Sequence, residues 1–138
     1  ILTTGELLLE PTKIYVPEVM AALEAGIDIK GMVHITGGGF YDNIPRVLPE
    51  SLGAEIDKNA FPQVMAINAL REYITAAKLD IKEEELYRVF NMGIAFIFVI
   101  AEDELINLSD VMEEAGSKLY TIGRVTRGGG VKIKGIDA

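Results

Sequence analysis

The chain has 138 residues, no cysteine and a single histidine, and it carries a formal net charge of −8 at pH 7. The lack of cysteine excludes disulfides and thiolate metal sites, and the acidic charge disfavours the phosphate backbone of nucleic acid as a partner. With 49% hydrophobic and 25% charged residues, the composition is that of a globular protein, and the length favours one domain over residues 1–138.

The first third of the chain is predicted to contain an extended arm, a helix and a strand. The arm covers the leucines at 7–9 and the segment after them. A helix is expected from Pro17, because apolar residues recur there at helical spacing, and Gly26 is a suitable end. GMVHIT, residues 31–36, is predicted to form a short strand.

Three glycines separate this strand from the next helix. Because proline is tolerated only in the first turn of a helix, Pro45 predicts a helix start near Asp42 or Asn43. A second strand is expected at LGAEID, residues 52–57. The remaining pattern predicts, in chain order, a helix opened by Pro62, a helix over 82–90, a long buried strand over 92–101, a helix from Leu105 to Gly116, and two terminal strands over 119–126 and 131–134.

This order of elements predicts an α+β fold with an α/β-like alternation of strands and helices. We expect a mixed sheet with helices packed on it. The last two strands flank a second glycine run at 128–130, which we interpret as the turn of a β-hairpin. A binding site at that run, served by Arg124 and Arg127, is the weaker interpretation.

Membrane insertion is not expected from any part of the sequence. The longest apolar run is MGIAFIFVIA at residues 92–101. Ten residues are too few for a helix that crosses a bilayer, which needs about 20, and the pattern of a signal peptide is missing. Together with the lack of cysteine, this favours a cytoplasmic protein.

The stretch HITGGGF, residues 34–40, carries the strongest chemical signal. A strand puts His34 and Thr36 on one face, and glycines let successive main-chain N–H groups approach an anion without a Cβ in the way. The competing interpretations are a tight turn without a ligand and a structural histidine. The positions predicted to contact an anion are Thr36, Gly37, Gly38, Gly39 and Asn43.

A second marked stretch is FNMG, residues 90–93, which leads into the long apolar strand. Asn91 is either a turn residue that hydrogen-bonds its own backbone or a binding residue near the mouth of the glycine loop. The acidic residues offer neither a catalytic carboxylate pair nor the spacing of metal ligands. No metal site is therefore expected in this chain.

Four stretches together resemble the C-terminal half of the phosphoribosylformylglycinamidine cyclo-ligases, also called aminoimidazole ribonucleotide synthetases. They are LLLEPTKIYV at 7–16, HITGGGFYDNIPRVLP at 34–49, LYRVFNMGIAF at 86–96 and YTIGRV at 120–125. The resemblance runs essentially from end to end of the chain. Two details depart from the family pattern: Lys13 replaces an arginine, and Ala95 and Phe96 replace a glycine and a methionine.

The resemblance implies a two-domain enzyme of de novo purine synthesis. Such enzymes use ATP and Mg²⁺ to close the imidazole ring of formylglycinamidine ribonucleotide: the formyl oxygen is phosphorylated, a nitrogen attacks that carbon, and phosphate leaves. The N-terminal domain holds most of the ATP and metal residues and most of the dimer contact. We therefore expect a C-terminal fragment, beginning at Ile1, that does not turn over alone, with residues 7–9 and Ile14 facing the missing domain or driving self-association.

The resemblance also implies roles for the site residues. The glycine loop would contact a phosphate, either the 5′-phosphate of the nucleotide or the transferred one, with Asn91 as a further partner. Lys13 would be a phosphate contact that lacks the bidentate fork of arginine. His34 becomes the candidate catalytic residue, which orients substrate or moves a proton near neutral pH. The implied partners are the N-terminal domain, a second copy in a homodimer, and a phosphorylated ribonucleotide.

Two alternatives stay open at this point. One is the homologous domain of a related enzyme, such as formylglycinamidine ribonucleotide synthetase, selenophosphate synthetase, thiamine-monophosphate kinase or a hydrogenase maturation protein. The other is a regulatory or scaffolding domain that keeps the core pattern without binding a ligand. The HITGGG and NIPRVLP segments favour the cyclo-ligases.

Overall fold

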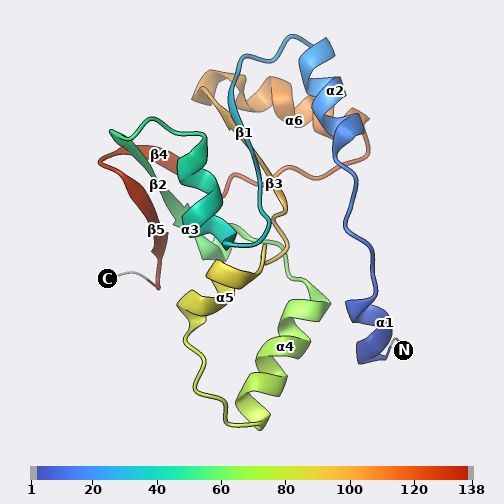
Figure 1. Cartoon of the computed structure of the whole chain (residues 1–138). Helices are drawn as coiled ribbons and strands as arrows, with labels where there is room; N and C mark the ends of the chain where they lie inside the picture. The colour runs from blue at the N-terminus through green and yellow to red at the C-terminus, as the bar shows by residue number, and fades with distance from the viewer. Residues whose placement is uncertain (1–2, 137–138) are drawn as a thin grey trace.

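The computed structural model describes residues 3–136 and contains helices and strands in alternation (Figure 1). The expected α+β fold is confirmed. The α-helices are α1 (Thr4–Leu8), α2 (Val16–Glu24), α3 (Gly39–Asn43), α4 (Met65–Ala76), α5 (Glu83–Val89) and α6 (Leu105–Glu114). The strands are β1 (Ile29–His34), β2 (Leu52–Asp57), β3 (Phe96–Ile100), β4 (Gly123–Arg127) and β5 (Gly130–Lys134). Three 3-10 turns, η1 (Ile44–Arg46), η2 (Lys58–Ala60) and η3 (Glu102–Glu104), connect them.

The strands form two sheets. β1 pairs with β3 in antiparallel fashion, and His34 lies opposite Phe96 in that register. The other sheet has the order β4-β2-β5, in which β2 is antiparallel to β4 and parallel to β5. This second sheet is therefore the mixed sheet that the sequence predicted.

The expected terminal hairpin is wrong, because β4 and β5 lie on opposite sides of β2 and do not pair with each other. The glycine run between them crosses the end of β2, where the Gly128 N–H donates to the Ser51 carbonyl at 2.9 Å. A Cβ on Gly53 would collide with the carbonyl oxygens of Gly128 and Gly130. The glycines thus let the chain pass over the end of β2, and they do not form the turn of a two-stranded hairpin.

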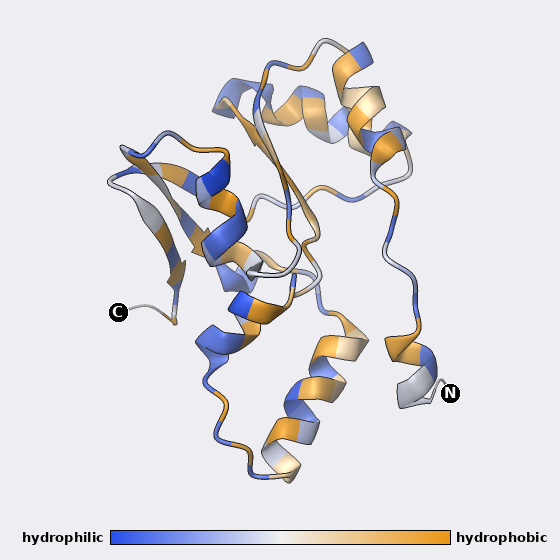
Figure 2. Ribbon diagram, in the orientation of Figure 1, coloured by the Kyte–Doolittle hydropathy of each residue, from blue (hydrophilic) through white to orange (hydrophobic). Residues whose placement is uncertain are grey.

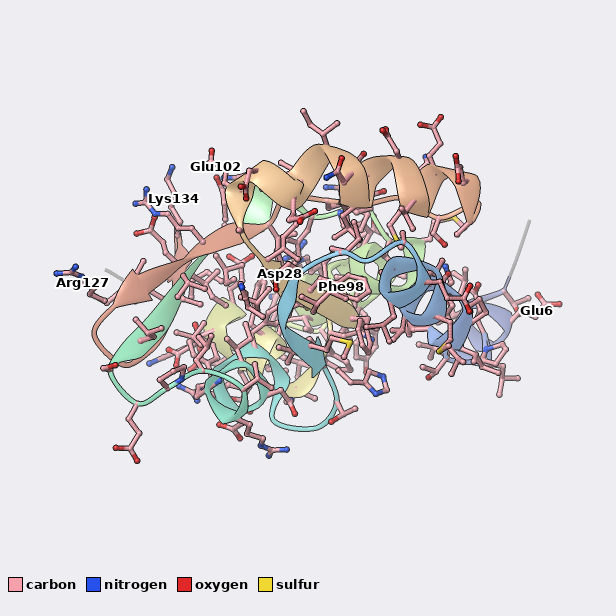
Figure 3. All side chains as sticks on the ribbon, turned by 90° about the horizontal axis from the view of Figure 1, so that it is seen from above. Glu6, Asp28, Phe98, Glu102, Arg127 and Lys134 are labelled. Carbon is pink, nitrogen blue, oxygen red and sulfur yellow. The ribbon has the colours of Figure 1, made fainter. Side chains whose placement is uncertain are left out.

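Helices cover the sheets on different sides. Figure 1 shows α2 and α6 next to each other at one end of the β1–β3 sheet, while α3 and α5 lie beside the β4-β2-β5 sheet. Viewed from above in Figure 3, α6 lies along one side of the strands and α3 along the other. α4 extends away from the sheets, and α1 packs beside it.

Two apolar clusters hold these parts together, and Figure 2 shows β3, which contributes to both, as a continuous apolar segment. The larger cluster lies under α3 and α5 and includes Phe40, Tyr87 and Ile133, all of them at most 2% exposed. The smaller cluster joins α2 to α6 through Ala22 and Leu108. The glycine loop that follows β1 lies over the larger cluster, because Phe40 comes directly after it.

Several strand boundaries differ from the predictions for physical reasons. The strand expected over 92–101 is only β3, because Met92 and Gly93 adopt left-handed backbone angles (φ 53° and 92°) that end any extended run. β3 is half-buried rather than fully buried, since β1 is its sole strand partner within residues 3–136. The strand expected over 119–126 is shifted to β4, whereas β2 has the predicted bounds.

Helix boundaries differ where local signals compete. The arm expected at 7–9 contains the short helix α1, which Thr3 and Glu6 cap reciprocally. The helix after the glycines begins at Gly39, and Pro45 falls in the separate turn η1 instead of its first turn. α4 begins at Met65, three residues after Pro62.

Substitution of Gly53 tests the strand crossing. We expect Gly53→Ala to lower the free energy of unfolding by about 1–3 kcal/mol, because its Cβ would push the two glycine carbonyls away from β2. Gly31→Ala is the matched control in β1, where the nearest atom to a new Cβ is 3.6 Å away. Urea unfolding of both variants measures the difference, and equal losses would contradict the crossing as the cause.

Candidate functional site

The glycine loop joins the end of β1 to α3 through a tight turn. The Ile35 N–H donates to the Ala95 carbonyl at 2.8 Å, so the sheet contact continues one residue past β1. The Thr36 carbonyl then accepts the Gly39 N–H at 3.0 Å and closes the turn. Gly38 and Gly39 have positive φ angles of 93° and 56°, which explains why side-chain-bearing residues are disfavoured at both positions.

The three glycines have different structural roles. A Cβ on Gly39 would collide with the carbonyl group of Tyr87, so this glycine lets the loop touch the main chain of α5. A Cβ on Gly38 would lie 2.6 Å from a carboxylate oxygen of Asp42. Around Gly37 a Cβ would meet no atom within 4 Å, and its φ angle is ordinary. Folding therefore accounts for two of the three glycines and leaves Gly37 without a packing role.

Asn43 holds the glycine loop from inside. The residue is 4% exposed, and its amide nitrogen donates to the carbonyl oxygens of Thr36 at 3.2 Å, Gly37 at 3.3 Å and Gly39 at 2.7 Å. Its amide oxygen lies 3.5 Å from the Thr36 hydroxyl. Asn43 therefore binds the carbonyl groups of the loop and leaves its N–H groups uncontacted.

Two N–H groups of the glycine loop are unused. Among residues 3–136, no group accepts a hydrogen bond from the main-chain N–H of Gly37 or Gly38. Gly37 and Thr36 are exposed to solvent. The Asp42 carboxylate lies beside Gly38, so the Gly37 side of the loop is the less acidic approach for an anion. This geometry offers two N–H donors and a hydroxyl group to one small oxyanion.

Asn91 has the local contact of a turn residue. Its side-chain oxygen accepts the Gly93 N–H at 3.0 Å, and its carbonyl accepts the Ile94 N–H at 2.8 Å. The turn lies between α5 and β3, just after the end of α5 that touches Gly39. Its role as a ligand-binding residue stays a prediction.

His34 is exposed at the end of β1 and is surrounded by aromatic rings. Its ring centroid lies 6.3 Å from that of Tyr15 and 6.1 Å from that of Phe96. His34 shares the exposed face of the strand with Thr36, as the alternation predicted. Sequence reasoning missed Tyr15, because no periodic or motif signal links it to a strand that begins 14 positions later.

Lys13 binds a buried carboxylate. Its ammonium group forms an ion pair with Glu18 and donates to the Ser117 hydroxyl at 2.8 Å, while that hydroxyl donates to Glu18 at 2.6 Å. The Glu18 side chain is 9% exposed, and its Oε2 atom has no hydrogen-bond partner in the described part of the chain. Lys13 reaches only one of the two carboxylate oxygens, whereas the fork of an arginine presents two parallel donors.

The hydrogen bonds from Lys13 and Ser117 lower the pKa of Glu18 below its ordinary value, with burial opposing them. Sequence reasoning missed Glu18 and Ser117, although Glu18 is an acidic residue in the first turn of a helix, where such residues are commonly exposed. The contact with Ser117 spans 99 positions and has no local signal.

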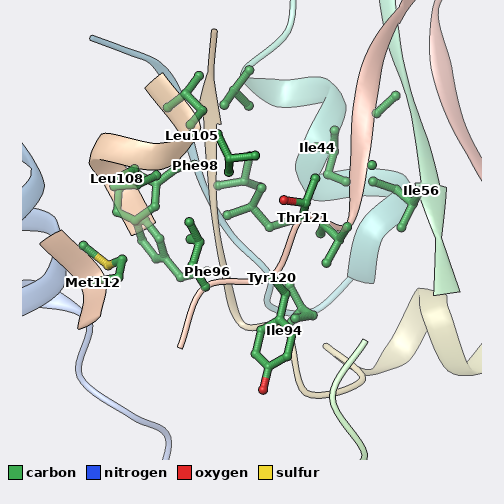
Figure 4. A pocket seen from close by; sticks show the side chains of 18 of the residues that line it. Ile44, Ile56, Ile94, Phe96, Phe98, Leu105, Leu108, Met112, Tyr120 and Thr121 are labelled. Atoms are coloured by element: carbon green, nitrogen blue, oxygen red, sulfur yellow. The ribbon is translucent and has the colours of Figure 1, made fainter. Parts of the chain in front are cut away.

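A cavity lies beside the glycine loop and not at it. It has a volume of about 790 Å³ and opens between β3 and the segment 119–125. Figure 4 shows apolar side chains around it, including those of Ile44, Phe96 and Leu108. Of the predicted phosphate-binding positions, Lys13 lines it together with Glu18 and Ser117, whereas none of the loop and turn residues Thr36, Gly37, Gly38, Gly39, Asn43 and Asn91 does. The cavity therefore offers apolar surface without the polar groups of the loop.

The second glycine run has no equivalent set of groups. Arg124 forms an ion pair with Glu55 at 2.9 Å, and Figure 3 shows Arg127 pointing outward at the far end of the sheet. Residues 3–136 contain no group of three or more histidine, aspartate or glutamate side chains placed to hold a metal ion. No helix among these residues is long and apolar enough to cross a membrane.

Comparison with known proteins identifies the family. Residues 2–136 match the model of the AIR synthase related protein, C-terminal domain. The chain belongs to this family. It is 50% identical over 131 residues to a phosphoribosylformylglycinamidine cyclo-ligase of Bacillus subtilis, and 48% identical over the same length to one of Bacillus velezensis; each match covers 95% of this chain and 36% of the relative. A relative from Exiguobacterium sibiricum is 42% identical over 135 residues, which cover 98% of this chain and 38% of that protein.

These matches confirm the resemblance that the sequence motifs indicated. The chain spans little more than a third of the length of these curated relatives. The matched region includes the glycine loop and the FNMG turn, since the family model covers both. In this AIR synthase related domain the glycine loop is thus a site with open main-chain donors, and the neighbouring cavity is mainly apolar with Lys13, Glu18 and Ser117 in its wall.

Alanine substitutions separate the roles of the glycines. We expect Gly39→Ala to lower the free energy of unfolding by about 1–3 kcal/mol or more, because overpacking against Tyr87 adds to strain at a positive φ angle. Gly37→Ala should stay within about 0.5 kcal/mol of wild type. Chemical denaturation measures both, and a Gly37→Ala loss as large as that of Gly39→Ala would contradict the distinction.

The pH dependence of stability tests the Glu18 cluster. Because the pKa of Glu18 is lowered in the folded state, its charged form stabilises the fold at neutral pH, and this contribution is lost as the pH falls through the folded-state pKa. We expect Glu18→Gln to be less stable than wild type at pH 7, with the difference shrinking in acid. Urea unfolding across a pH series measures it, with exposed Glu113→Gln as control. A difference that is independent of pH would contradict the cluster.

Proposed function

We propose that this chain is the C-terminal domain of an ATP-dependent cyclo-ligase, which converts formylglycinamidine ribonucleotide to aminoimidazole ribonucleotide in purine biosynthesis. The observation that carries the proposal is 50% identity to a protein named phosphoribosylformylglycinamidine cyclo-ligase across 95% of the chain. The glycine loop, with its unused N–H groups, supports a phosphorylated substrate. The domain would act in the cytoplasm as the C-terminal half of a two-domain polypeptide.

The glycine loop is the proposed phosphate-binding part of the cleft. The N–H groups of Gly37 and Gly38 and the Thr36 hydroxyl would donate to phosphate oxygens, either of the 5′-phosphate or of the transferred phosphate. Gly39 and Asn43 would keep the loop in this shape through their contacts with Tyr87 and the loop carbonyls. Asn91 is the proposed further partner. Lys13 is proposed to act indirectly, since its ammonium group is already bound to Glu18.

His34 is the proposed active-site side chain. It lies two residues before Thr36 on the same exposed face of the chain. An imidazole there would orient the substrate or move a proton between the ring-closing nitrogen and solvent near neutral pH. Bound ATP would supply the phosphoryl group that activates the formyl oxygen, so that phosphate leaves when the nitrogen attacks the carbon.

The described residues do not fit Mg²⁺, because no group of carboxylates or histidines among residues 3–136 converges on one point. We derive no step through the metal, and propose that it is held by the N-terminal domain of the same polypeptide. The glycine loop offers donors for one phosphate group, whereas ATP carries three. Most of the ATP contacts are therefore also proposed to lie in that domain.

Exposed apolar side chains favour a contact with this N-terminal domain. Leu9 is 82% and Ile14 is 75% exposed, and both lie on the segment that leads into α2. Leu8, Val16 and Met20, which lie on α1 and α2, are exposed as well. Burial of such a surface would stabilise a domain contact. A homodimer of the intact protein, made mainly by the N-terminal domain, completes the proposal.

The proposed reaction is tested with the purified polypeptide that carries this domain and its N-terminal part. We expect one aminoimidazole ribonucleotide for each ADP released from formylglycinamidine ribonucleotide and ATP, and no turnover by the 138-residue chain alone. If ATP is hydrolysed with selenide or thiamine monophosphate instead, the domain would be assigned to one of the related enzymes. Absence of any ATP-dependent reaction would favour a regulatory domain.

Two substitutions divide binding from chemistry in that protein. We expect His34→Ala to lower kcat at least about tenfold, the usual scale for loss of a general acid or base. Gly37→Ala should mainly raise KM, because a Cβ would obstruct the approach of the phosphate to a loop that still folds. Unchanged kinetics in His34→Ala would return this histidine to a structural role.

A further inference from the structure

Three aromatic rings meet around His34 at the end of the β1–β3 sheet, and Phe98 packs on the Phe96 ring at 5.4 Å. Tyr15 is stacked on Phe96 with ring centroids 5.5 Å apart and an interplanar angle of 27°. Tyr15 also meets His34 edge-on, at 6.3 Å and 64°. Phe96 and His34 lie 6.1 Å apart as cross-strand partners. Each of the three rings therefore contacts the other two.

The orientation of His34 depends on these ring contacts. Within residues 3–136, neither ring nitrogen of His34 has a hydrogen-bond partner. Its cross-strand neighbour Phe96 is fixed by the register of the sheet. Tyr15 comes from outside the sheet, at the residue before α2. Of the three rings, Tyr15 is therefore the one whose position depends on the segment before α2 and not on the sheet.

Tyr15 is itself held in place by the Glu18 cluster. The Lys13 ammonium lies 5.6 Å from the centroid of the Tyr15 ring, while it is bound to the buried Glu18 and to Ser117. Lys13 and Ser117 are 104 positions apart in the chain. The extended segment before α2 is therefore attached to Glu18 in α2 and to Ser117, three residues after the end of α6, at a position only two residues before Tyr15.

We propose that Tyr15 is a positioning residue for His34, held against the imidazole by the Lys13–Glu18–Ser117 cluster. The proposal rests on the proposed function of His34. Tyr15 restricts the imidazole to the side of the strand that carries Thr36, so that its free nitrogens face a phosphorylated ligand on the glycine loop. The hydroxyl group of Tyr15 is not needed for this, because both contacts are made by the ring.

The single histidine makes a direct test available. In the 138-residue chain the imidazole C–H resonances of His34 are the only ones of their kind, and stacked or edge-on rings shift them. We expect Tyr15→Leu to move these resonances towards the positions of a freely rotating histidine. Tyr15→Phe should leave them near their wild-type positions. Ser117→Ala should move them in the same direction as Tyr15→Leu, by less.

Tyr73→Leu is the matched control, because Tyr73 is 65% exposed on α4 and lies outside the aromatic cluster. The dispersion of methyl resonances in each sample reports whether the variant is folded. Unmoved His34 resonances in folded Tyr15→Leu would overturn the proposal. An equal movement in Tyr73→Leu would also overturn it, because the effect would then be general.

Kinetics of the intact polypeptide separate this proposal from the proposed function. We expect Tyr15→Leu to lower kcat about 10- to 100-fold, as misplacement of a reacting group does, with KM changed less than about threefold. Tyr15→Phe should restore most of kcat. If His34→Ala is fully active while Tyr15→Leu still moves the resonances, the contact stands but the proposed function of His34 fails. If His34→Ala is impaired and Tyr15→Leu is not, the positioning role fails.

Discussion

The direct contact between the main chain of Gly39 and the carbonyl group of Tyr87 is the constraint on which the site depends. A Cβ has no room there, so the loop after β1 and the end of α5 approach each other as bare backbone. Beneath this contact, Phe40, Phe61 and Tyr87 pack together with centroids 5.3–5.9 Å apart. Burial raises the pKa of Tyr87, and the neighbouring Arg71 opposes this shift. The shape of the loop thus depends on the aromatic part of the larger core.

Both sheets contribute to the site, because the glycine loop connects the end of β1 to the helix that lies beside the other sheet. Its first residues continue β1, whose exposed face carries His34, while its last residues begin α3 above the β4-β2-β5 sheet. Asn43 secures the loop from the second side, and Tyr15 contacts the histidine from the first. A relative shift of the two sheets would therefore change the distance between the imidazole and the loop N–H groups.

Sequence signals predicted the elements well where interactions within a short segment determine the secondary structure. β2 and α5 were predicted nearly at their bounds, because alternation and an acidic first turn are properties of short segments. The predicted hairpin was wrong because the pairing of β4 and β5 with β2 depends on residues far apart in sequence. The glycine loop was recognisable, but its division into packing glycines and Gly37 was not, since α5 supplies the obstructing atoms. The sequence did not indicate Glu18 and Ser117 either, because their contact joins residues 99 positions apart.

The place of β2 between β4 and β5 has a consequence for how the chain folds. Both partners of the central strand of the mixed sheet lie about half the chain length later in the sequence. Such long-range pairings close large loops before they add stability, and they slow folding. During synthesis, β2 leaves the ribosome before either partner strand exists, and its two edges become paired only after β4 and then β5 are made. The larger core, and with it the support of the glycine loop, therefore forms only after these two strands are available.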